Sequence, residues 1–496
     1  MSPSLLLLIV IGYFSLLLAV AWRTSRGANN QTFFIGNRSS NWMLVAFGMV
    51  GTSLSGVTFI SVPGAVGATA FSYFQIVLGQ FFGYLVIVFV LLPLYYRMNL
   101  VSIYAYLSRR MGLRAYQTGA GFFIVSRTLG ATARLYLVVK ILQEIILDGL
   151  HVPFWLTACV ILLLIVLYTF EGGVKTIVWT DTLQTACMLG GLVICTGYLL
   201  DRMDLTLATS LQRMDAAGLS TMFVTDINSK LFFGKQMLAG MFIAIAMTGM
   251  DQEMMQKNIS VKTLAGAQKN VLLLSCVMLG VVFLFLFLGG LLYLYAPTAG
   301  IAARGDQIFA TTVFEHMPVL VQLIFVIALI SALFPSADGA ITALTSSLCI
   351  DLLYMQRRSD WSEARKRQVR RAVHLGFALL FLALVLVFRW VDDPSMIGLI
   401  LKVAAYTYGP LLGLFAFGIL TRRQPRDAWV PLVAISAPLL SWLIDGQQRA
   451  LFGAYQLGLE LLLINGALTF AGLWVLSAPM RPTPVHAAIA LGAGES

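Results

Sequence analysis

The chain has 496 residues, of which 59% are hydrophobic and only 11% are charged. Soluble globular domains carry roughly 25% charged residues, so a water-soluble protein of this composition would lack the polar surface needed to cover its core. We therefore expect an integral membrane protein that is covered by lipid. The net charge of +11 at pH 7 could indicate nucleic-acid binding, but the distribution of the basic residues along the chain argues against it.

Apolar stretches of roughly 20 residues, the length that crosses the hydrocarbon of a bilayer, recur along the whole chain. The pattern predicts an all-α membrane protein with about thirteen transmembrane helices. The predicted spans lie near residues 4–22, 42–65, 72–96, 117–147, 154–171, 178–200, 236–255, 271–295, 318–349, 373–390, 396–419, 428–444 and 456–477. The longest polar stretch, 201–235, is expected to hold a short surface helix.

Lys and Arg residues gather in alternate loops. The loops that follow odd-numbered spans carry about three times as many of them as the opposite loops. The positive-inside rule then places the N-terminus outside and the C-terminus in the cytoplasm, which requires an odd number of spans. We expect a single polytopic domain over residues 1–477 in the bacterial inner membrane, followed by a disordered cytoplasmic tail over 478–496.

Two of the predicted spans are interrupted by small and polar residues. Glycines and a proline recur between positions 48 and 64 among hydroxyl side chains, and the seventh span turns polar after Gly249. Irregular backbone is tolerated within a membrane where it lines a cavity. Interrupted spans in corresponding places of two halves are typical of inverted-repeat transporters, and these two lie five spans apart. Close packing of helices through small residues is the alternative.

Several motifs, in order along the chain, carry a resemblance to a known family. The segment from Gly51 to Gly64 (GTSLSGVTFISVPG) resembles the broken first core helix of the sodium:solute symporter family, which has the leucine-transporter fold. The stretches 34–38, 172–181, 249–256 and 331–351 resemble other motifs of this family. The resemblance implies one leading helix (4–22), a ten-helix core of five plus five inverted repeats (42–419) with broken first and sixth core helices, and two trailing helices (428–477).

The resemblance also implies a sodium ion as the coupling ion and no organic cofactor. By the family pattern, sodium would be bound by the carbonyls of Gly51, Leu54 and Ala332 and by the hydroxyl of Ser336. Oxygen ligands suit a hard cation. The family commonly has two adjacent hydroxyl residues in the ninth span, whereas here Pro335 precedes Ser336. Pro335 should bend its helix and free a carbonyl near residue 331, which could compensate for the missing hydroxyl. Plain packing by small residues is the alternative.

Two acidic residues within the predicted spans, Asp181 and Asp338, point to function because a carboxylate in the membrane is costly. In some members of the family an acid at the position of Asp181 contributes to a second sodium site. The two carboxylates could hold a second cation, or one of them could be protonated. Alternatively, Asp181 lies at the inner mouth of its helix and pairs with a nearby Lys or Arg.

Arg134, in the middle of the fourth span, resembles the arginine with which sialic-acid transporters of this family bind the substrate carboxylate. A guanidinium group binds a carboxylate through two hydrogen bonds, which Lys cannot match. The alternative is a structural role in which Arg134 pairs with Asp181, Asp338 or Glu144. Arg127, two helical turns earlier, is expected to extend toward the inner surface.

Further residues are expected to complete the substrate site. Three hydroxyl residues match the substrate-facing hydroxyls of the sialic-acid transporters, and three side chains of the third span could line the pocket with them. These candidates are Ser53, Ser55 and Thr58, together with Phe74, Gln75 and Gln80.

These features predict a secondary active transporter, not an enzyme, that moves a small polar solute together with sodium by alternating access. A carboxylate such as sialic acid or a monocarboxylate is the expected solute. The expected partners are sodium, the solute and the lipid bilayer, with no nucleic acid and no obligate protein partner. The chain contains no nucleotide-binding P-loop. A proton-coupled symporter of a neutral sugar or amino acid, and a transporter-like sensor, are the alternatives.

Overall fold

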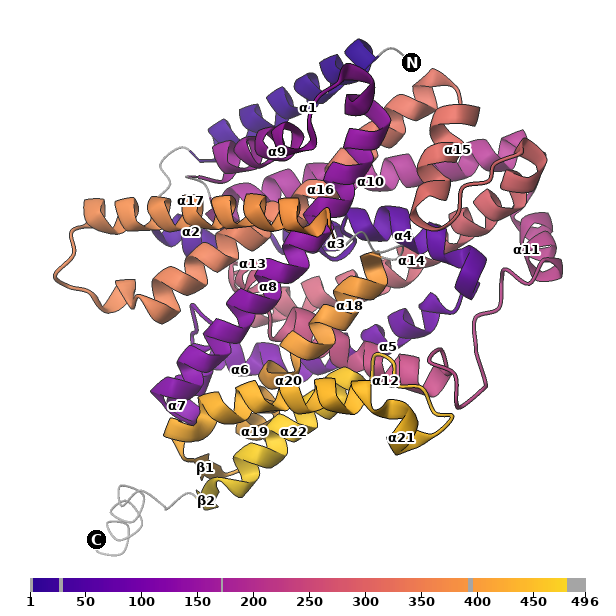
Figure 1. Ribbon diagram of the computed structural model, residues 1–496. Coiled ribbons are helices and arrows are strands. Elements are labelled where there is room, and N and C mark those ends of the chain that lie inside the picture. Colours follow the sequence, from indigo (N-terminus) through magenta and orange to yellow (C-terminus); the bar gives the residue numbers. More distant parts are fainter. Residues whose placement is uncertain (1–2, 26–29, 171–172, 391–395, 480–496) are drawn as a thin grey trace, which may run out of the picture.

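The computed structural model describes residues 3–25, 30–170, 173–390 and 396–479 (Figure 1). Nearly all regular structure is helical, and the described chain contains one small antiparallel sheet, formed by β1 (Arg423–Pro425) and β2 (Ser477–Pro479). The expectation of an all-α fold is confirmed. The expected disordered tail lies outside the described residues from position 480 onward, whereas Ala478 and Pro479 belong to β2 and are not part of a disordered segment.

Seven helical runs are long and apolar enough to cross a bilayer. They are α5 (Tyr73–Val86) continued by η2 (Ile87–Leu91) and α6 (Leu92–Arg97), α8 (Leu113–Leu142), α10 (Gly173–Arg202), α14 (Leu264–Ala299), α16 (Val319–Ser347) continued by η7 (Leu348–Leu352), α17 (Glu363–Phe388), and α20 (Val430–Gly446) preceded by η9 (Asp427–Trp429). Three shorter apolar helices are α1 (Pro3–Thr24), α9 (Phe154–Thr169) and α22 (Leu461–Val475).

Three further spans are pairs of helices that bend sharply at a break. The pair α3 (Trp42–Ser53) and α4 (Gly56–Thr69) bends by 53°. The run α12 (Phe233–Ala244) and η5 (Ile245–Gly249) bends by 63° against α13 (Gln252–Ile259), and α18 (Met396–Thr407) bends by 45° against α19 (Gly409–Leu420). Counting each pair as one span, the described residues contain ten runs that are long and apolar enough to cross a bilayer, and the three shorter apolar helices are also needed to reach the thirteen spans expected from the sequence.

The first two breaks fall in the second and seventh spans, where interruptions were predicted. The third break, between α18 and α19, was not predicted. Its cause is local: Pro410 stands in the first turn of α19 and has no N–H to donate, so the helical hydrogen bonding cannot continue across the break. Gly409 beside it packs against Asn465 of α22.

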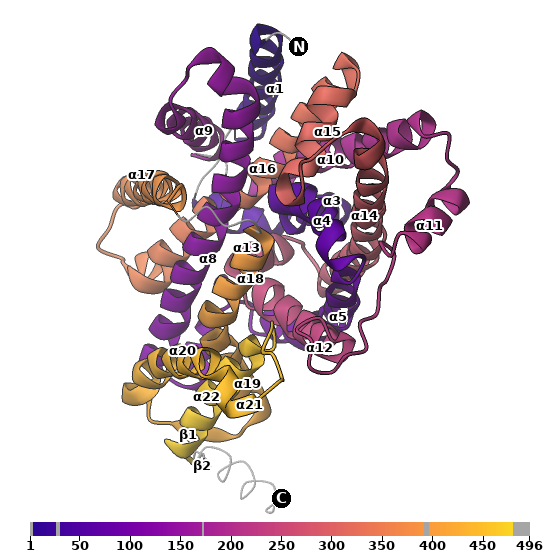
Figure 2. The ribbon, with the colours of Figure 1, turned by 45° about the vertical axis from the view of Figure 1, so that its right-hand side comes forward.

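Short elements connect the spans. They are α2 (Asn30–Ile35), η1 (Gly36–Arg38), α7 (Ala105–Arg110), η3 (Gln143–Leu147), η4 (Asp148–Leu150), α11 (Leu207–Ala216), η6 (Gly305–Gln307), α15 (Ile308–His316), η8 (Met355–Arg357) and α21 (Gln448–Phe452). The helix α11 is the surface helix expected within 201–235, and a capping box at Thr206 begins it. The turn between α16 and α17 and the helix α11 lie at opposite sides of the molecule (Figures 1 and 2).

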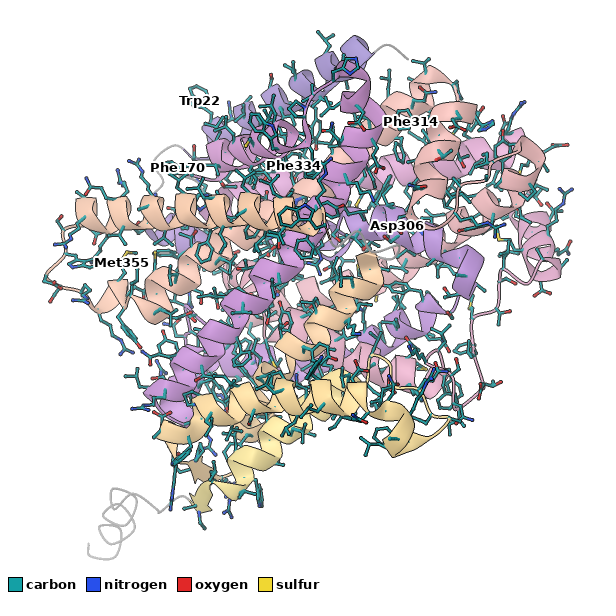
Figure 3. The ribbon with its side chains drawn as sticks, in the orientation of Figure 1. Trp22, Phe170, Asp306, Phe314, Phe334 and Met355 are labelled. Carbon is teal, nitrogen blue, oxygen red and sulfur yellow. The ribbon has the colours of Figure 1, made fainter. Side chains whose placement is uncertain are left out.

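The packing of the spans brings the first break to the centre of the molecule. The helix α16 packs against α10, α8 and α3, while α14 packs against α4 and α5 packs against α12. Large apolar side chains cover the outside: Trp22 projects outward from α1, whereas Phe334 of α16 is buried inside the bundle (Figure 3). Such an apolar exterior fits a lipid environment.

Candidate functional site

The break between α3 and α4 leaves the backbone carbonyl groups of residues 51–54 without helical partners. The N–H of Leu54 donates to the carbonyl of Val50 (2.8 Å), and the N–H of Phe59 donates to the carbonyl of Ser55 (3.2 Å). Between these two bonds, the carbonyls of Gly51 and Leu54 accept no hydrogen bond from any described residue. Unwound carbonyls of this kind coordinate ions in transporters with broken helices.

The helix α16 lies directly against this break. A Cβ atom added to Gly56, the first residue of α4, would lie 3.7 Å from the carbonyl oxygen of Ala332. Ser336 is buried one helical turn further along α16. The structure therefore brings the four residues expected to bind sodium into one region. The helix α16 runs without a break from Val319 to Ser347 through Pro335, and the bend expected at Pro335 stays a prediction.

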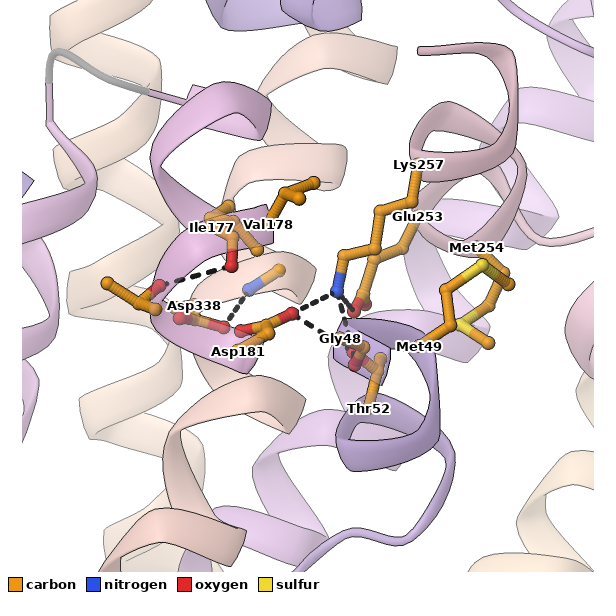
Figure 4. Close-up of polar contacts among 12 residues, drawn as sticks. Gly48, Met49, Thr52, Ile177, Val178, Asp181, Glu253, Met254, Lys257 and Asp338 are labelled. Atoms are coloured by element: carbon orange, nitrogen blue, oxygen red, sulfur yellow. Dashed lines mark hydrogen bonds and ion pairs between the residues drawn. The ribbon is translucent and has the colours of Figure 1, made fainter. Parts of the chain in front are cut away.

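Asp181 of α10 is fully buried and pairs with Lys257 of α13 (Figure 4). The Lys257 Nζ atom donates to Oδ2 of Asp181 (2.7 Å) and to the hydroxyl of Thr52 (2.6 Å), and it lies 3.5 Å from Oε1 of Glu253. The other carboxylate oxygen of Asp181, Oδ1, is buried without a hydrogen-bond partner in the described chain. Asp181 thus has the Lys partner that the alternative interpretation required, and one oxygen remains available.

Asp338 of α16 is also fully buried and lies within electrostatic reach of Asp181. The Tyr168 hydroxyl donates to its Oδ2 atom (2.7 Å). None of the salt bridges among the described residues involves Asp338. The two intramembrane acids therefore share one neighbourhood, in which Lys257 neutralises the first and the second has only hydrogen-bond donors.

The second break, between η5 and α13, is closed by side chains. The hydroxyls of Tyr95 and Tyr104 donate to the carbonyls of Gly249 (2.8 Å) and Met250 (2.9 Å). Asp251 caps α13 by accepting from the N–H groups of Glu253 (2.9 Å) and Met254 (3.2 Å). These bonds satisfy the carbonyls of Gly249 and Met250 and two N–H groups at the start of α13 within the protein.

Arg127 of α8 joins this second break. Its guanidinium hydrogen-bonds to the carboxylate of Glu253 and lies 4.0 Å from that of Asp251. Tyr408, at the third break, donates its hydroxyl to Asp251 (2.7 Å). The side chain of Arg127 is only 4% exposed, so the expectation that it extends to the inner surface is wrong. Two buried acids hold it inside the bundle.

A small cavity of about 100 Å³ opens beside the first break. Five of the residues expected to bind the solute line it, namely Ser53, Ser55, Thr58, Gln80 and Arg134. The hydroxyl of Ser53 is buried and has no hydrogen-bond partner among the described residues. The cavity therefore lies next to the carbonyls of Gly51 and Leu54 and shares the same unwound segment.

Two of the expected solute-binding residues lie outside this lining. Gln75 is buried against the outer connection: its amide donates to the carbonyls of Ser72 (3.0 Å) and Leu231 (3.1 Å) and accepts from the N–H of Val224 (3.2 Å). Phe74 packs against Phe283 of α14. Both side chains stabilise packing around α5 in this structure.

Arg134 lines the cavity without an acidic partner. Asp181 pairs with Lys257, Asp338 accepts from Tyr168, and Glu144 lies 3.9 Å from Lys140. Within the described ranges, Arg134 forms neither an ion pair nor a hydrogen bond with another side chain. The proposed structural partners of Arg134 are thus engaged elsewhere.

The sequence interpretation missed several residues of this region. Lys257 was counted only as a loop charge, although its spacing of four residues from Glu253 indicates a helical ion pair. Tyr84 and Thr248 also line the cavity. Gln184 of α10 is fully buried, and neither polar atom of its amide has a partner among the described residues. No pattern in a single sequence distinguishes Tyr84, Thr248 or Gln184 from ordinary packing positions.

The broken spans, the unwound segment beside α16 and the adjoining cavity define a secondary transporter built from inverted repeats. The model of the sodium:solute symporter family matches residues 33–427. The chain belongs to the sodium:solute symporter family, and sodium is the coupling ion of this family of symporters. The resemblance seen in the sequence is confirmed.

Known relatives agree with this assignment. The chain is 24% identical over 432 residues to the human sodium/iodide cotransporter, covering 82% of this chain and 65% of that protein. It is 22% identical over 462 residues to the sodium/sialic acid symporter SiaT of Proteus mirabilis (strain HI4320), covering 86% and 87% of the two chains. A solved Na⁺-coupled sialic acid symporter in a substrate-bound, outward-open state shares the fold, with a TM-score of 0.82, 18% identity and coverage of 96% and 99%.

Proposed function

We propose that the protein carries a small carboxylate solute across the membrane together with sodium by alternating access. The observation that supports this most directly is the unwound segment with the unpartnered carbonyls of Gly51 and Leu54, which adjoins α16 at Gly56 and lines the cavity through Ser53 and Ser55. In this proposal the carbonyls of Gly51, Leu54 and Ala332 and the hydroxyl of Ser336 bind sodium. The transport cycle needs no covalent chemistry.

Coupling follows from the shared segment. Sodium would order the backbone at positions 51–54, and the solute would contact Ser53, Ser55 and Thr58 on the same segment. Each ligand would favour the same conformation, so each increases the affinity for the other by the same factor. Arg134 would bind the carboxylate of the solute through two parallel hydrogen bonds.

A second cation site is the natural role of Asp181 and Asp338. The unpartnered Oδ1 of Asp181 and the neighbouring carboxylate of Asp338 offer oxygen ligands for a second sodium ion. A proton on one of the two acids is the alternative. Sodium dependence of transport with a Hill coefficient above one would favour the second ion, whereas a coefficient of one would favour the proton.

The expected orientation belongs to the same proposal. The basic turn between α16 and α17 and the polar connection around α11 lie at opposite sides of the molecule (Figure 1). Placing the basic side in the cytoplasm puts the N-terminus outside and the C-terminus inside. We place the chain in the bacterial inner membrane, as a single domain over residues 1–477. Cysteine labelling from each side of the membrane tests this orientation.

The decisive experiment measures thermal stability of the purified protein against sodium concentration, with potassium at equal ionic strength as the reference. Sodium should stabilise the wild-type protein, and Ser336→Ala should weaken sodium affinity by about tenfold or more, since an interaction with a charged group is lost. Ser275→Ala is the matched control, because the buried Ser275 hydroxyl bonds only to the carbonyl of Leu272 of its own helix (2.8 Å). Unchanged sodium affinity in Ser336→Ala would contradict the proposed ion site.

A further inference from the structure

The helix α1 packs against α9, α10 and α16 and has two distinct faces (Figure 1). One face is buried against the bundle, and it includes Tyr13, Phe14, Leu17 and Ala21. Their spacing is that of a single helical face. On the opposite side Ile11 and Leu16 are exposed. An exposed apolar face of this kind suits lipid, so the buried face is the one that connects α1 to the rest of the protein.

Two pairs of hydroxyl groups among the described residues connect α1 to its neighbours. In the middle of α1, the Tyr13 hydroxyl lies 2.6 Å from Oγ of Ser331 of α16, and both side chains are buried. At the end of α1, Oγ1 of Thr24 lies 3.1 Å from Oγ1 of Thr176 of α10. Because a buried hydroxyl without a partner is costly, each pair fixes α1 against one particular helix.

The Tyr13 pair falls on the segment of α16 that carries the proposed sodium ligands. Ser331 directly precedes Ala332, and Ser336 follows Ala332 by one helical turn. Pro335 in the same segment has no N–H, so the carbonyl of Ser331 lacks the usual helical donor four residues ahead. A helix with such a missing bond is easier to bend, so a contact from outside the helix gains importance here.

Apolar packing on this side of α16 leaves open space. Phe14 contacts Phe334 edge to face, with ring centroids 4.9 Å apart. An apolar cavity of about 220 Å³ lies beside these two rings, between α1, α9 and α16. Apolar contacts have no fixed direction, so packing next to open space allows the helix to shift. The directional bond between Tyr13 and Ser331 restricts that shift.

We infer that Tyr13 is a positioning residue for the sodium site: its hydroxyl holds Ser331 and thereby sets the place of Ala332 and Ser336 beside the break between α3 and α4. This inference rests on the proposed sodium symport and assigns α1 a part in ion binding. Groups outside the ligand shell that orient the ligands change the affinity of metal sites by about tenfold or more when they are removed.

The test compares sodium affinities of variants of the purified full-length protein, measured as thermal stabilisation by sodium against potassium at equal ionic strength. Tyr13→Phe removes only the hydroxyl and should weaken sodium affinity by about fivefold or more. Ser331→Ala removes the other half of the pair and should have an effect of similar size. Because both variants remove the same bond, the double variant should bind sodium no more weakly than either single variant.

Thr24→Val is the matched control, because it removes the other hydroxyl pair of α1 and leaves Ser331 untouched. It should lower thermal stability in potassium, as Tyr13→Phe does, but leave sodium affinity unchanged. Ser15→Ala is a second control, since the exposed Ser15 hydroxyl donates to the carbonyl of Ile11 in its own helix (2.8 Å) and should affect neither quantity. A merely structural role of Tyr13 would lower stability without changing sodium affinity.

The inference is overturned if Tyr13→Phe binds sodium as tightly as the wild type, if Thr24→Val loses as much affinity, or if the losses add in the double variant. In these cases the wild-type protein still responds to sodium and Ser336→Ala still weakens that response, so the proposed function stands. Absence of sodium stabilisation in the wild type, or unchanged affinity in Ser336→Ala, counts against the proposed function and the inference together, so the two failures are distinguishable.

Discussion

The two predicted breaks differ in how their backbone is satisfied. At the second break, tyrosine hydroxyls occupy the carbonyls of Gly249 and Met250, and Asp251 caps the helix that follows. At the first break, the carbonyls of Gly51 and Leu54 have no partner among the described residues. Buried carbonyls are rarely left unpartnered. We propose that a ligand completes the first break, whereas at the second break side chains of the protein already occupy the carbonyls of Gly249 and Met250.

We call the second break the closed break and the first the open break. Loss of the side chains around the closed break should therefore reduce the stability of the protein more than comparable losses at the open break. Arg127→Leu leaves Glu253 and Asp251 without their shared cation, and we expect a loss of stability of about 3–5 kcal/mol. The measurement is thermal unfolding, monitored through the intrinsic fluorescence of the protein. Arg114→Leu serves as the control on the same helix, and adding Glu253→Gln to Arg127→Leu should recover part of the loss. A stability within error of the wild type would contradict the scaffold role.

Steric crowding at the open break should reduce both stability and sodium binding. Gly56→Ala places a methyl group into the side chain of Val138 of α8, so α4 and α8 must move apart or Val138 must shift, while the carbonyl of Ala332 stays at ordinary contact distance. Overpacking of this kind costs about 1–3 kcal/mol. Sodium titration of the variant should show weaker binding. Gly190→Ala, at a position with nothing within 4 Å, is the matched control. If Gly56→Ala bound sodium as tightly as the wild type, the packing at Gly56 would not influence the proposed ion site.

The smallest effect should come from a single hydrogen bond at the closed break. Tyr95→Phe removes the donor to Gly249 and should reduce stability by about 1 kcal/mol while leaving sodium affinity unchanged. Tyr106→Phe is the control, because the Tyr106 hydroxyl makes no hydrogen bond to the described residues. If Tyr95→Phe instead creates a new sodium response, the second break also holds an ion, and the contrast between the breaks fails.

Much of the fold could be predicted from the sequence, because span length and interrupted spans are local properties. Thirteen spans and two breaks follow from hydrophobic runs and from glycine, proline and hydroxyl residues within them. The third break was missed even though Gly409 and Pro410 stand within a predicted span. A Gly-Pro pair inside an apolar run is compatible with either a kink or a break, and the neighbouring helix decides between them.

The site was predictable only in part, since side-chain partners come from distant segments. The hydroxyls beside the first break and Arg134 line the cavity, and their role in binding the solute stays a prediction. Arg127 was misjudged because its two acidic partners lie more than a hundred residues away, on and before α13. Gln75 and Phe74 lie outside the cavity lining because α5 turns them toward the outer connection and α14. Neighbours of this kind are visible only once the helices are packed.

Hydrogen exchange at the two breaks tests the central claim most directly. The purified protein would be labelled in sodium chloride and, separately, in potassium chloride of equal ionic strength, and peptides covering 50–58 and 248–256 would be compared by mass spectrometry. Sodium should slow exchange of the amides around the first break and leave those around the second unchanged. Equal exchange in both salts at 50–58, or protection confined to 248–256, would contradict the assignment of the open break as the sodium site.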